Sequence, residues 1–326
     1  MTDNTWPTVD TELIDDVTLY SAKLIIPVTG PVIIDGAVAI HGDRVVHVGK
    51  RRWVLKALKQ EMTAHGTIHE RHWDGVLTPG LINAHTHLQY SGMVQVGQGT
   101  YDRFRAWELA FNEVYAEAQK TQPWKQWAED GARQMVESGT TAAADIVTDL
   151  DAAGALASQG MHGIAYWEVM GWHNAEWMEK GRTELIRQLR RMNEEQLPNL
   201  GISPHAPYTL ESEPFVDLPD IARQLNMRLH IHLAETPLEA GTYPPVLTTY
   251  SAADWSDHDW ESYRQLKEVG KGASAIQFVD QLGSLGPDVH IAHGVWANGE
   301  DRRILRQRGV GVALCPRSNR ITNTGK

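Results

Sequence analysis

The sequence predicts an α/β protein built on a (β/α)8 barrel of the TIM type, with a small β-sandwich portion at its N-terminus. A barrel of this type takes about 250 residues, and the chain has 326. From residue 76 onward, apolar strand-like runs alternate with helix-like stretches, as in βα units around a parallel sheet. We therefore assign 1–75 to the N-terminal part of a small β-sandwich domain and 76–326 to the barrel.

The N-terminal portion is predicted from short β-branched runs that are separated by turn residues. These runs cover residues 17–26, 31–40 and 44–48. Runs of this length that are rich in valine and isoleucine and bounded by glycine, proline or aspartate are typical of antiparallel strands.

The barrel portion contains seven candidate strands. They are residues 76–87, 140–147, 163–169, 200–204, 228–233, 289–293 and 310–315. Residues 124–138 and 183–195 lie between them and carry apolar side chains near the helical period of 3.6. The longest insertion, residues 236–280, is predicted to form either a lid over the pocket or a surface excursion.

Composition narrows the functional classes. The chain is 42% hydrophobic and 22% charged, and its formal net charge is −11. A nucleic-acid-binding surface needs clustered lysine and arginine, so we expect a small-molecule substrate, no nucleic acid and no membrane partner. Cys315 is the single cysteine, which excludes an intrachain disulfide and a cysteine-cluster zinc site. The acidic N-terminus does not resemble a signal peptide, and we expect a cytoplasmic protein, with a homo-oligomer left open.

The strongest chemical signal is the run from Pro79 to His87, an apolar strand that ends in His-x-His. Side chains two residues apart on a strand point to the same face, so His85 and His87 can converge on one metal ion. The position also suits catalysis, because barrel enzymes build their sites at the C-terminal ends of the strands.

A second strand ends in His232-Leu233-Ala234-Glu235. An imidazole there supplies a third nitrogen ligand, and a carboxylate just past the strand suits proton transfer. His230 has the same parity as His232, so spacing alone does not choose between them. The deeper position of His230 favours a buried, hydrogen-bonded core histidine.

Two more histidines lie at predicted strand ends. His293 ends the strand at 289–293, and His205 lies between Pro204 and Pro207 after the strand at 200–204. Histidines at the ends of four separate strands point to one shared site.

Taken together, these motifs resemble the mononuclear aminohydrolase branch of the amidohydrolase superfamily. This branch contains cytosine, guanine and adenosine-type deaminases and triazine hydrolases. Its signature Pro-Gly-Leu-Ile-Asn-Ala-His-Thr-His is matched from Pro79 to His87, and the later motifs occur in the family order. The resemblance covers residues 17–320.

The resemblance implies a role for each motif residue. It implies that His85, His87 and His232 bind one divalent metal ion, for which zinc suits the imidazole-rich set and iron is also compatible. Glu235 would shuttle protons between water and the substrate ring, and His293 would polarise the attacking water. His205 would face the substrate.

Further substrate contacts are predicted around these histidines. The run from Cys315 to Asn319 resembles the pocket-lining Cys-Pro-x-Ser-Asn loop of the family, which makes Asn319 a candidate contact. Arg317 in this loop either meets a polar group of the substrate or faces solvent. Gln89 is a candidate for reading a ring edge, and Trp107 either stacks on the ring or packs within the loop.

One part of the family pattern has no counterpart. In this family the fourth metal ligand is an aspartate at the end of the eighth strand, and the sequence stops at Lys326 after the seventh. We therefore expect a barrel that is incomplete at its C-terminus, from a fragment or a truncated product, with uncertain activity.

The function that follows is hydrolysis of a C–NH2 bond of a heteroaromatic ring, such as an aminopurine nucleoside or related base, by a metal-activated water. The alternatives are a chlorohydrolase-type member that acts on another leaving group, and an inactive barrel that only binds metal or ligand. Dinuclear members of the superfamily use a lysine on the fourth strand, and residues 200–205 contain none. The His-x-Glu zinc deaminases need two further cysteines, which a chain with one cysteine cannot supply.

Overall fold

The computed structural model describes residues 13–194, 197, 199–241, 266 and 269–325. The chain divides into two compact units, Met1–Gly80 and Leu81–Lys326, a few residues beyond the predicted boundary at residue 75. Most of the predicted insertion at 236–280 lies outside the described residues, so its role as a lid or a surface excursion stays a prediction. Within the described part of the chain, no helix is long and apolar enough to cross a bilayer.

The first unit is a four-stranded sheet with one helix. The strands are β1 (Ile14–Ile25), β2 (Ile33–His41), β3 (Arg44–Lys50) and β4 (Met62–Leu77), and the helix is α1 (Arg51–Glu61). The strand order is β3-β2-β1-β4, with β4 parallel to β1 and the other pairs antiparallel. Val17 and Leu19 of β1 pack against Val54 and Leu58 of α1 in the core of this unit.

The three predicted runs of this unit form β1, β2 and β3, whereas β4 and α1 were not predicted. Most side chains of β4 are exposed, and the strand contains four histidine, glutamate and arginine residues in the run His69 to His72. A strand without a buried face lacks the alternation of apolar and polar residues on which strand prediction rests. The described residues of the unit form one sheet, and the sandwich stays a prediction.

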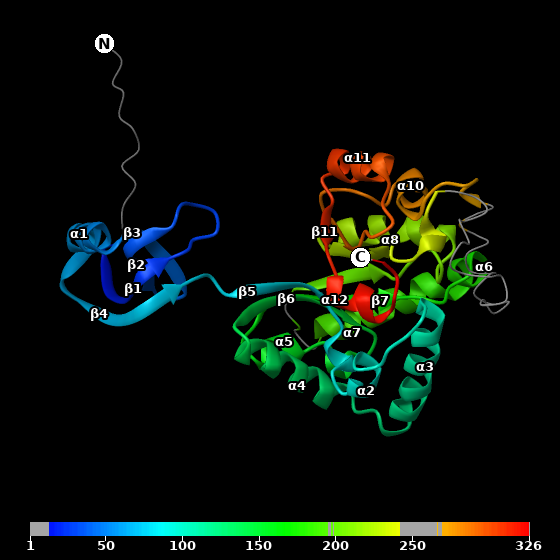
Figure 1. The fold of residues 1–326 in the computed structure, drawn as a ribbon, viewed down its shortest axis with the longest axis horizontal. Coiled ribbons are helices and arrows are strands. Elements are labelled where there is room, and N and C mark those ends of the chain that lie inside the picture. Colours follow the sequence, from blue (N-terminus) through cyan, green and yellow to red (C-terminus); the bar gives the residue numbers. More distant parts are fainter. Residues whose placement is uncertain (1–12, 195–196, 198, 242–265, 267–268, 326) are drawn as a thin grey trace, which may run out of the picture. The chain divides into compact units, whose positions relative to one another are not determined.

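The second unit is built around seven parallel strands (Figure 1). They are β5 (Leu81–Thr86), β6 (Thr140–Val147), β7 (His162–Val169), β8 (Leu200–Pro204), β9 (Arg228–Leu233), β10 (Val289–His293) and β11 (Gly311–Ala313). Neighbours in sequence are neighbours in the sheet, and every recorded pair is parallel. This is the pattern of repeated βα units that the sequence predicted.

Helices connect the strands. The longer ones are α3 (Phe104–Thr121), α4 (Trp124–Glu137), α7 (Arg182–Glu194), α8 (Ser212–Gln224), α10 (Ala275–Gln281), α11 (Gly299–Arg308) and α12 (Pro316–Ile321). Short helical segments are α2 (Val94–Gly97), α5 (Ala155–Ser158), α6 (Asn174–Glu176), the 3-10 turns η1 (Leu88–Tyr90), η2 (Leu150–Ala152) and η4 (Pro237–Glu239), and the π-helical turn η3 (Trp177–Gly181). The predicted helices at 124–138 and 183–195 correspond to α4 and α7.

The sheet curves into a nearly closed barrel. Four strand spacings separate β5 from β9, which in a flat sheet would be about 19 Å. Nevertheless, Nδ1 of His85 on β5 lies 2.9 Å from Nε2 of His230 on β9. The two side chains meet across the barrel interior, and the predicted TIM-type fold class is confirmed.

Two predicted strand boundaries were wrong. The run at 76–87 is divided, because Val76 and Leu77 end β4 of the first unit and β5 begins only at Leu81. Pro79 has no N–H for a sheet ladder and Gly80 has no side chain to pack, so the chain leaves one sheet before it enters the other. The last strand is shorter than 310–315, because Cys315 is already the N-cap of α12.

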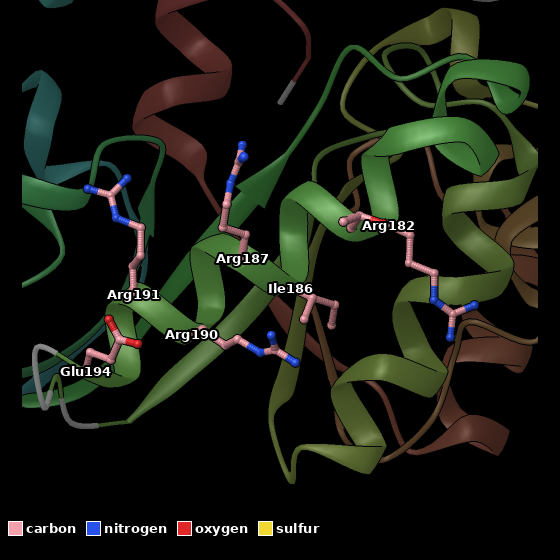
Figure 2. Close-up of a pocket in the computed structure, with 7 residues that line it drawn as sticks. Arg182, Ile186, Arg187, Arg190, Arg191 and Glu194 are labelled. Carbon is pink, nitrogen blue, oxygen red and sulfur yellow. The ribbon is translucent and has the colours of Figure 1, made fainter.

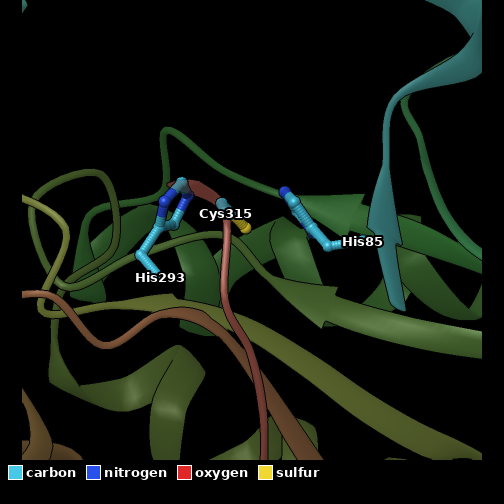
Figure 3. Close-up of side chains that lie close together, drawn as sticks. All are labelled: His85, His293 and Cys315. Atoms are coloured by element: carbon cyan, nitrogen blue, oxygen red, sulfur yellow. The ribbon is translucent and has the colours of Figure 1, made fainter. Parts of the chain in front are cut away.

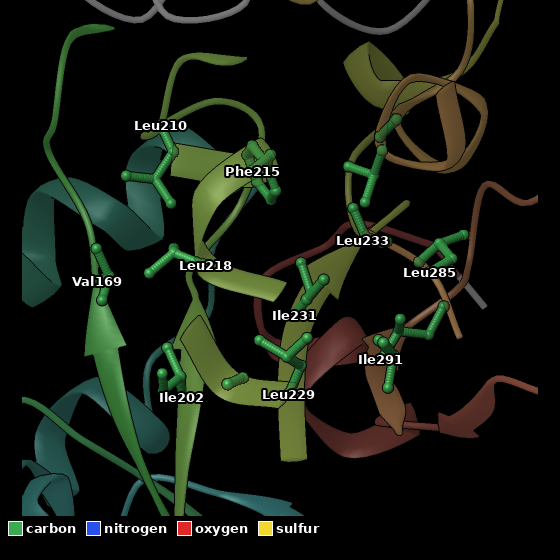
Figure 4. Close-up of a cluster of buried hydrophobic side chains, with 14 of the residues drawn as sticks. Val169, Ile202, Leu210, Phe215, Leu218, Leu229, Ile231, Leu233, Leu285 and Ile291 are labelled. Carbon is green, nitrogen blue, oxygen red and sulfur yellow. The ribbon is translucent and has the colours of Figure 1, made fainter. Parts of the chain in front are cut away.

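The hydrophobic core of the second unit lies between the outer face of the strands and the helices. Figure 4 shows Leu229, Ile231 and Leu233 of β9 in one buried cluster with Phe215 and Leu218 of α8. These five side chains are fully buried. Because side chains alternate along a strand, the residues between them on β9 point into the barrel.

The helix α7 has one apolar and one basic face. Its buried residues Leu185, Leu189 and Met192 recur at the helical period and belong to the core cluster. Figure 2 shows the other face, where an open pocket is lined by Arg182, Thr183, Ile186, Arg187, Arg190, Arg191 and Glu194. Arg187 pairs with Glu184 and Arg182 lies near Asp217, so part of this positive charge is neutralised locally.

Candidate functional site

The three predicted metal ligands converge at the mouth of the barrel. His85 is the fifth residue of β5, His87 follows that strand as the N-cap of η1, and His232 lies on β9. Their ligand atoms all lie within 4.8 Å of one another, and Nε2 of His87 is 3.2 Å from Nε2 of His232. Two nitrogen ligands about 2.05 Å from a tetrahedral zinc ion are about 3.3 Å apart. The spacing of His87 and His232 therefore fits one ion of this kind.

A hydrogen bond fixes the tautomer of His232 that can bind a metal ion. Its Nδ1 lies 3.1 Å from the carbonyl oxygen of His205, which can only accept, so Nδ1 carries the proton. The lone pair is then on Nε2, the atom that faces His87. Metal-binding histidines are commonly fixed in this way by a bond from the second ring nitrogen.

His85 is oriented by His230. The two rings are stacked with centroids 5.0 Å apart, and His230 is fully buried. His290 of β10 contacts His230 edge-on at 4.9 Å. Strand spacing alone did not choose between His230 and His232. In the structure, His232 joins His85 and His87 in the candidate metal set.

Burial keeps these imidazoles neutral at neutral pH. Burial, together with the smaller effect of neighbouring histidines, lowers the pKa of His87 to about 3 and that of His205 to about 4. The pKa values of His85 and His232 are shifted well below the usual range by the same two causes. A neutral imidazole has the lone pair that metal coordination requires.

Glu235 and His293 face each other beside this cluster. Both are buried, and Oε1 of Glu235 lies 3.5 Å from Nε2 of His293. The hydroxyl of Tyr208 donates to Oε2 of Glu235 at 3.3 Å. A buried carboxylate and an imidazole beside three candidate ligands can exchange protons with a water molecule held there.

The backbone turns His293 toward the site. Strand parity would place it with Val289 and Ile291 on the outer face of β10, but its φ is +77°. This left-handed conformation is uncommon for a residue with a side chain. Its Nδ1 donates to Oδ1 of Asn319 at 3.0 Å, which leaves the lone pair on Nε2 toward Glu235.

A buried carboxylate holds the turn that carries Glu235. Oxygens of Glu239 accept the backbone N–H groups of Ala234, Glu235 and Thr236 at 2.8 to 2.9 Å. Ala234 has φ +55°, and burial raises the pKa of Glu239 to about 8. Sequence reasoning did not single out Glu239, although Thr236-Pro-Leu-Glu239 has the spacing of a helix capping box.

The predicted substrate contacts have different surroundings. His205 lies within the histidine cluster, with its ring centroid 4.8 Å from that of His232. Gln89 is buried, and both polar atoms of its amide bond to Thr148. Its Nε2 donates to the Thr148 hydroxyl at 2.5 Å, and its Oε1 accepts from the Thr148 backbone N–H at 2.9 Å. Trp107 packs between Phe104 and Phe111 on α3.

The loop after β11 contributes one buried and one exposed candidate. Asn319 is buried and its carbonyl oxygen is engaged with His293, so it positions that ring. Arg317 is exposed on α12. Their direct contact with substrate stays a prediction.

Cys315 also approaches the histidines. Figure 3 shows it with His85 and His293, whose ligand atoms lie within 4.8 Å of its sulfur. The thiol donates to the carbonyl oxygen of Ala313 at 3.4 Å, and burial raises its pKa. His85 belongs both to this group and to the three-histidine set, so Cys315 borders the same candidate site.

Glu168 was missed by sequence reasoning. It lies near the end of β7, with Oε1 3.9 Å from both Nε2 of His205 and Nδ1 of His232. Burial raises its pKa to about 8. The only signal in the sequence was a single charged residue in the apolar run from Tyr166 to Val169, at the end of a barrel strand where functional residues concentrate.

Comparison with known proteins agrees with this geometry. The sequence model of the amidohydrolase protein family matches residues 76–243 of this chain. A curated 5-methylthioadenosine/S-adenosylhomocysteine deaminase of Thermococcus kodakarensis is 30% identical over 250 residues, which cover 75% of this chain and 52% of the relative. The chain therefore spans about half the length of that relative.

Two solved structures share the fold. An adenosine deaminase from Xanthomonas campestris with bound zinc superposes with a TM-score of 0.70 at 20% identity, covering 96% of this chain and 65% of the other. The aminofutalosine deaminase of Helicobacter pylori in complex with methylthio-coformycin gives a TM-score of 0.73 at 17% identity, covering 95% and 72%. At these identities the likeness concerns the fold.

Proposed function

The chain belongs to the amidohydrolase family, and on that premise we propose that it is a metal-dependent aminohydrolase that deaminates the adenine ring of a nucleoside. The observation that carries this proposal is the position of Glu235, whose buried carboxylate faces His293 beside the three-histidine set. The substrate class is supported by the relative that is named as a 5-methylthioadenosine/S-adenosylhomocysteine deaminase and by the solved structure that is named as an adenosine deaminase.

His85, His87 and His232 would hold one divalent metal ion. Zinc suits a set of imidazole nitrogens, and iron is also compatible with it. The bound metal would supply an activated water at neutral pH. Neutral rings, the fixed tautomer of His232 and the 3.2 Å separation of two Nε2 atoms support this assignment.

The protein side chains would move the protons. Glu235 would take a proton from the water and deliver it to the ring nitrogen next to the C–NH2 carbon. His293 would accept a hydrogen bond from the same water through Nε2, because its Nδ1 proton is committed to Asn319. After attack on the ring carbon, Glu235 would take the second proton from the hydroxyl now on that carbon and give it to the amino group. Ammonia would then leave as the ring carbonyl forms, and the ring nitrogen would keep the first proton.

The proposal is tested by ammonia release from adenosine, 5′-methylthioadenosine and S-adenosylhomocysteine, with the metal-loaded protein and with protein treated with a chelator. Inosine serves as the control because it lacks the amino group. We expect metal-dependent ammonia release from at least one adenine nucleoside. A metal-loaded protein that releases ammonia from none of them would contradict the proposal.

The cytoplasmic location, a homo-oligomeric state and the exclusion of nucleic acid and membrane partners stay predictions from the sequence.

A further inference from the structure

Glu168 has an oxygen that the protein leaves without a partner. Its side chain is only 3% exposed, and Oε1 has no hydrogen-bond partner among the described residues. Buried carboxylate oxygens are nearly always hydrogen-bonded, because removal from water without a replacement bond costs free energy. A feature of this kind needs either a strained core or a ligand to explain it.

The register of the sheet directs Glu168 into the barrel. Glu168 of β7 is paired with Ser203 of β8, so the two side chains lie on the same face of the sheet. Tyr166 shares the parity of Glu168 and contacts the ring of His230 at a centroid distance of 5.2 Å. Ser203 Oγ is also buried without a partner. The interior between β7 and β8 therefore contains two unpaired polar groups side by side.

Two imidazole nitrogens close to Glu168 do not satisfy it. Its Oε1 lies 3.9 Å from Nε2 of His205 and 3.9 Å from Nδ1 of His232, beyond hydrogen-bond distance. Nδ1 of His232 already donates to the carbonyl oxygen of His205, and the other nitrogen of His205 bonds to Thr209. The unpaired oxygen thus borders the candidate metal set without belonging to the hydrogen-bond network that orients it.

We propose that Glu168 determines substrate specificity by accepting a hydrogen bond from a sugar hydroxyl of the bound nucleoside. This inference rests on the proposed function. The amino group of an adenine ring must lie at Glu235 and the metal set, so the hydroxyls are the remaining donors of a simple adenine nucleoside.

The test compares nucleosides that differ in one hydroxyl. Adenosine, 2′-deoxyadenosine, 3′-deoxyadenosine and 5′-deoxyadenosine are assayed with the metal-loaded wild type, Glu168→Met and Glu168→Gln. Methionine keeps a similar volume without the acceptor, and glutamine keeps one oxygen. Glu179→Gln, at an exposed glutamate on η3, is the matched control. Metal content is measured for every variant.

We expect Glu168→Met to lower kcat/KM by about two- to tenfold for nucleosides that carry the contacted hydroxyl, the range for a hydrogen bond between neutral groups. The nucleoside that lacks this hydroxyl should lose little, Glu168→Gln should recover part of the loss, and metal content should stay unchanged. Glu179→Gln should match the wild type with every nucleoside.

Four results would overturn the assignment. An equal loss with all four nucleosides, or no loss, would show that Glu168 does not contact a hydroxyl. Loss of metal in Glu168→Met would make Glu168 a support for His232 instead. A wild type that deaminates no member of the series would overturn the proposed function and this inference together. A wild type that is active, but whose Glu168 variants show no dependence on a hydroxyl, would overturn this inference alone.

Discussion

The two faces of β9 differ in what they contribute to the molecule. On the outer face, Leu229, Ile231 and Leu233 are fully buried against apolar neighbours of the helices (Figure 4). On the inner face, His230 and His232 join other histidines at the centre of the barrel. One strand of six residues therefore supplies both core packing and candidate chemistry, because alternate side chains point in opposite directions.

Among the described residues, five buried side-chain polar atoms lack a hydrogen-bond partner, and four of them lie in or beside the barrel interior, whereas the fifth, Gln188 Oε1, is on α7. His87 Nδ1, His230 Nδ1, Ser203 Oγ and Glu168 Oε1 are all buried and unpaired. Unpaired polar groups lower stability, whereas a close-packed apolar face raises it. The difference indicates that the interior is arranged for a ligand and the outer wall for folding. The predictions below test that separation.

The largest effect is expected at Glu235. Glu235→Gln keeps the shape of the side chain but removes the carboxylate that would transfer the proton. We expect kcat to fall by about two to four orders of magnitude, as for other general acid–base groups. Metal content and the midpoint of thermal unfolding should match the wild type. Turnover close to that of the wild type would assign Glu235 to structure.

A change on the outer face of β9 should affect folding and leave the site intact. Ile231→Ala removes a fully buried side chain and leaves a cavity in the core. We expect the free energy of unfolding to fall by about 3 kcal/mol, within the range for such substitutions. Denaturant unfolding measures this loss, and the metal bound per folded molecule should not change. A loss of metal from folded protein would show that the two faces are not separable.

A smaller effect is expected for the residue that orients His293. Asn319→Ala removes the acceptor of the Nδ1 proton, so the ring can rotate or change tautomer. A hydrogen bond of this kind is worth about 1.5 kcal/mol, which corresponds to about a tenfold fall in kcat. Arg320→Ala, at an exposed residue of the same helix α12, is the control. Equal kcat values for the two variants would contradict the positioning role.

The smallest effect is expected on the solvent side of α8. Val216 is 44% exposed, although Phe215 and Leu218 on the same helix are fully buried. Val216→Ser should change the free energy of unfolding by less than about 0.5 kcal/mol, because it touches little of the core. A loss as large as that of Ile231→Ala would mean that the outer wall extends further than the burial pattern indicates.

The sequence was informative where local patterns decide the structure. The barrel strands and the histidines at their ends were predicted because apolar runs ending in polar residues are visible without tertiary contacts. The inward direction of His293 was not predictable from parity, since it depends on a positive φ at that residue. Gln89 looked free to read a substrate, but its amide is taken up by Thr148, which only the folded chain brings near it.

Single residues without a motif were also missed. Glu168 stands alone in an apolar strand, and its significance depends on the register of β7 with β8. Glu239 acts through three backbone N–H groups, a contact that the sequence shows only as a short capping pattern. Such residues are identified by burial and hydrogen bonding rather than by spacing.

Metal content tests the central claim most directly, because the inner face of the barrel is assigned to a metal centre. Elemental analysis after reconstitution with zinc or iron(II) should find one divalent ion per chain in the wild type. His232→Ala should lose it while the unfolding midpoint changes little, and His162→Ala, at an exposed histidine, should keep it. A folded wild type without metal, or a His232→Ala variant with the full complement, would contradict the account.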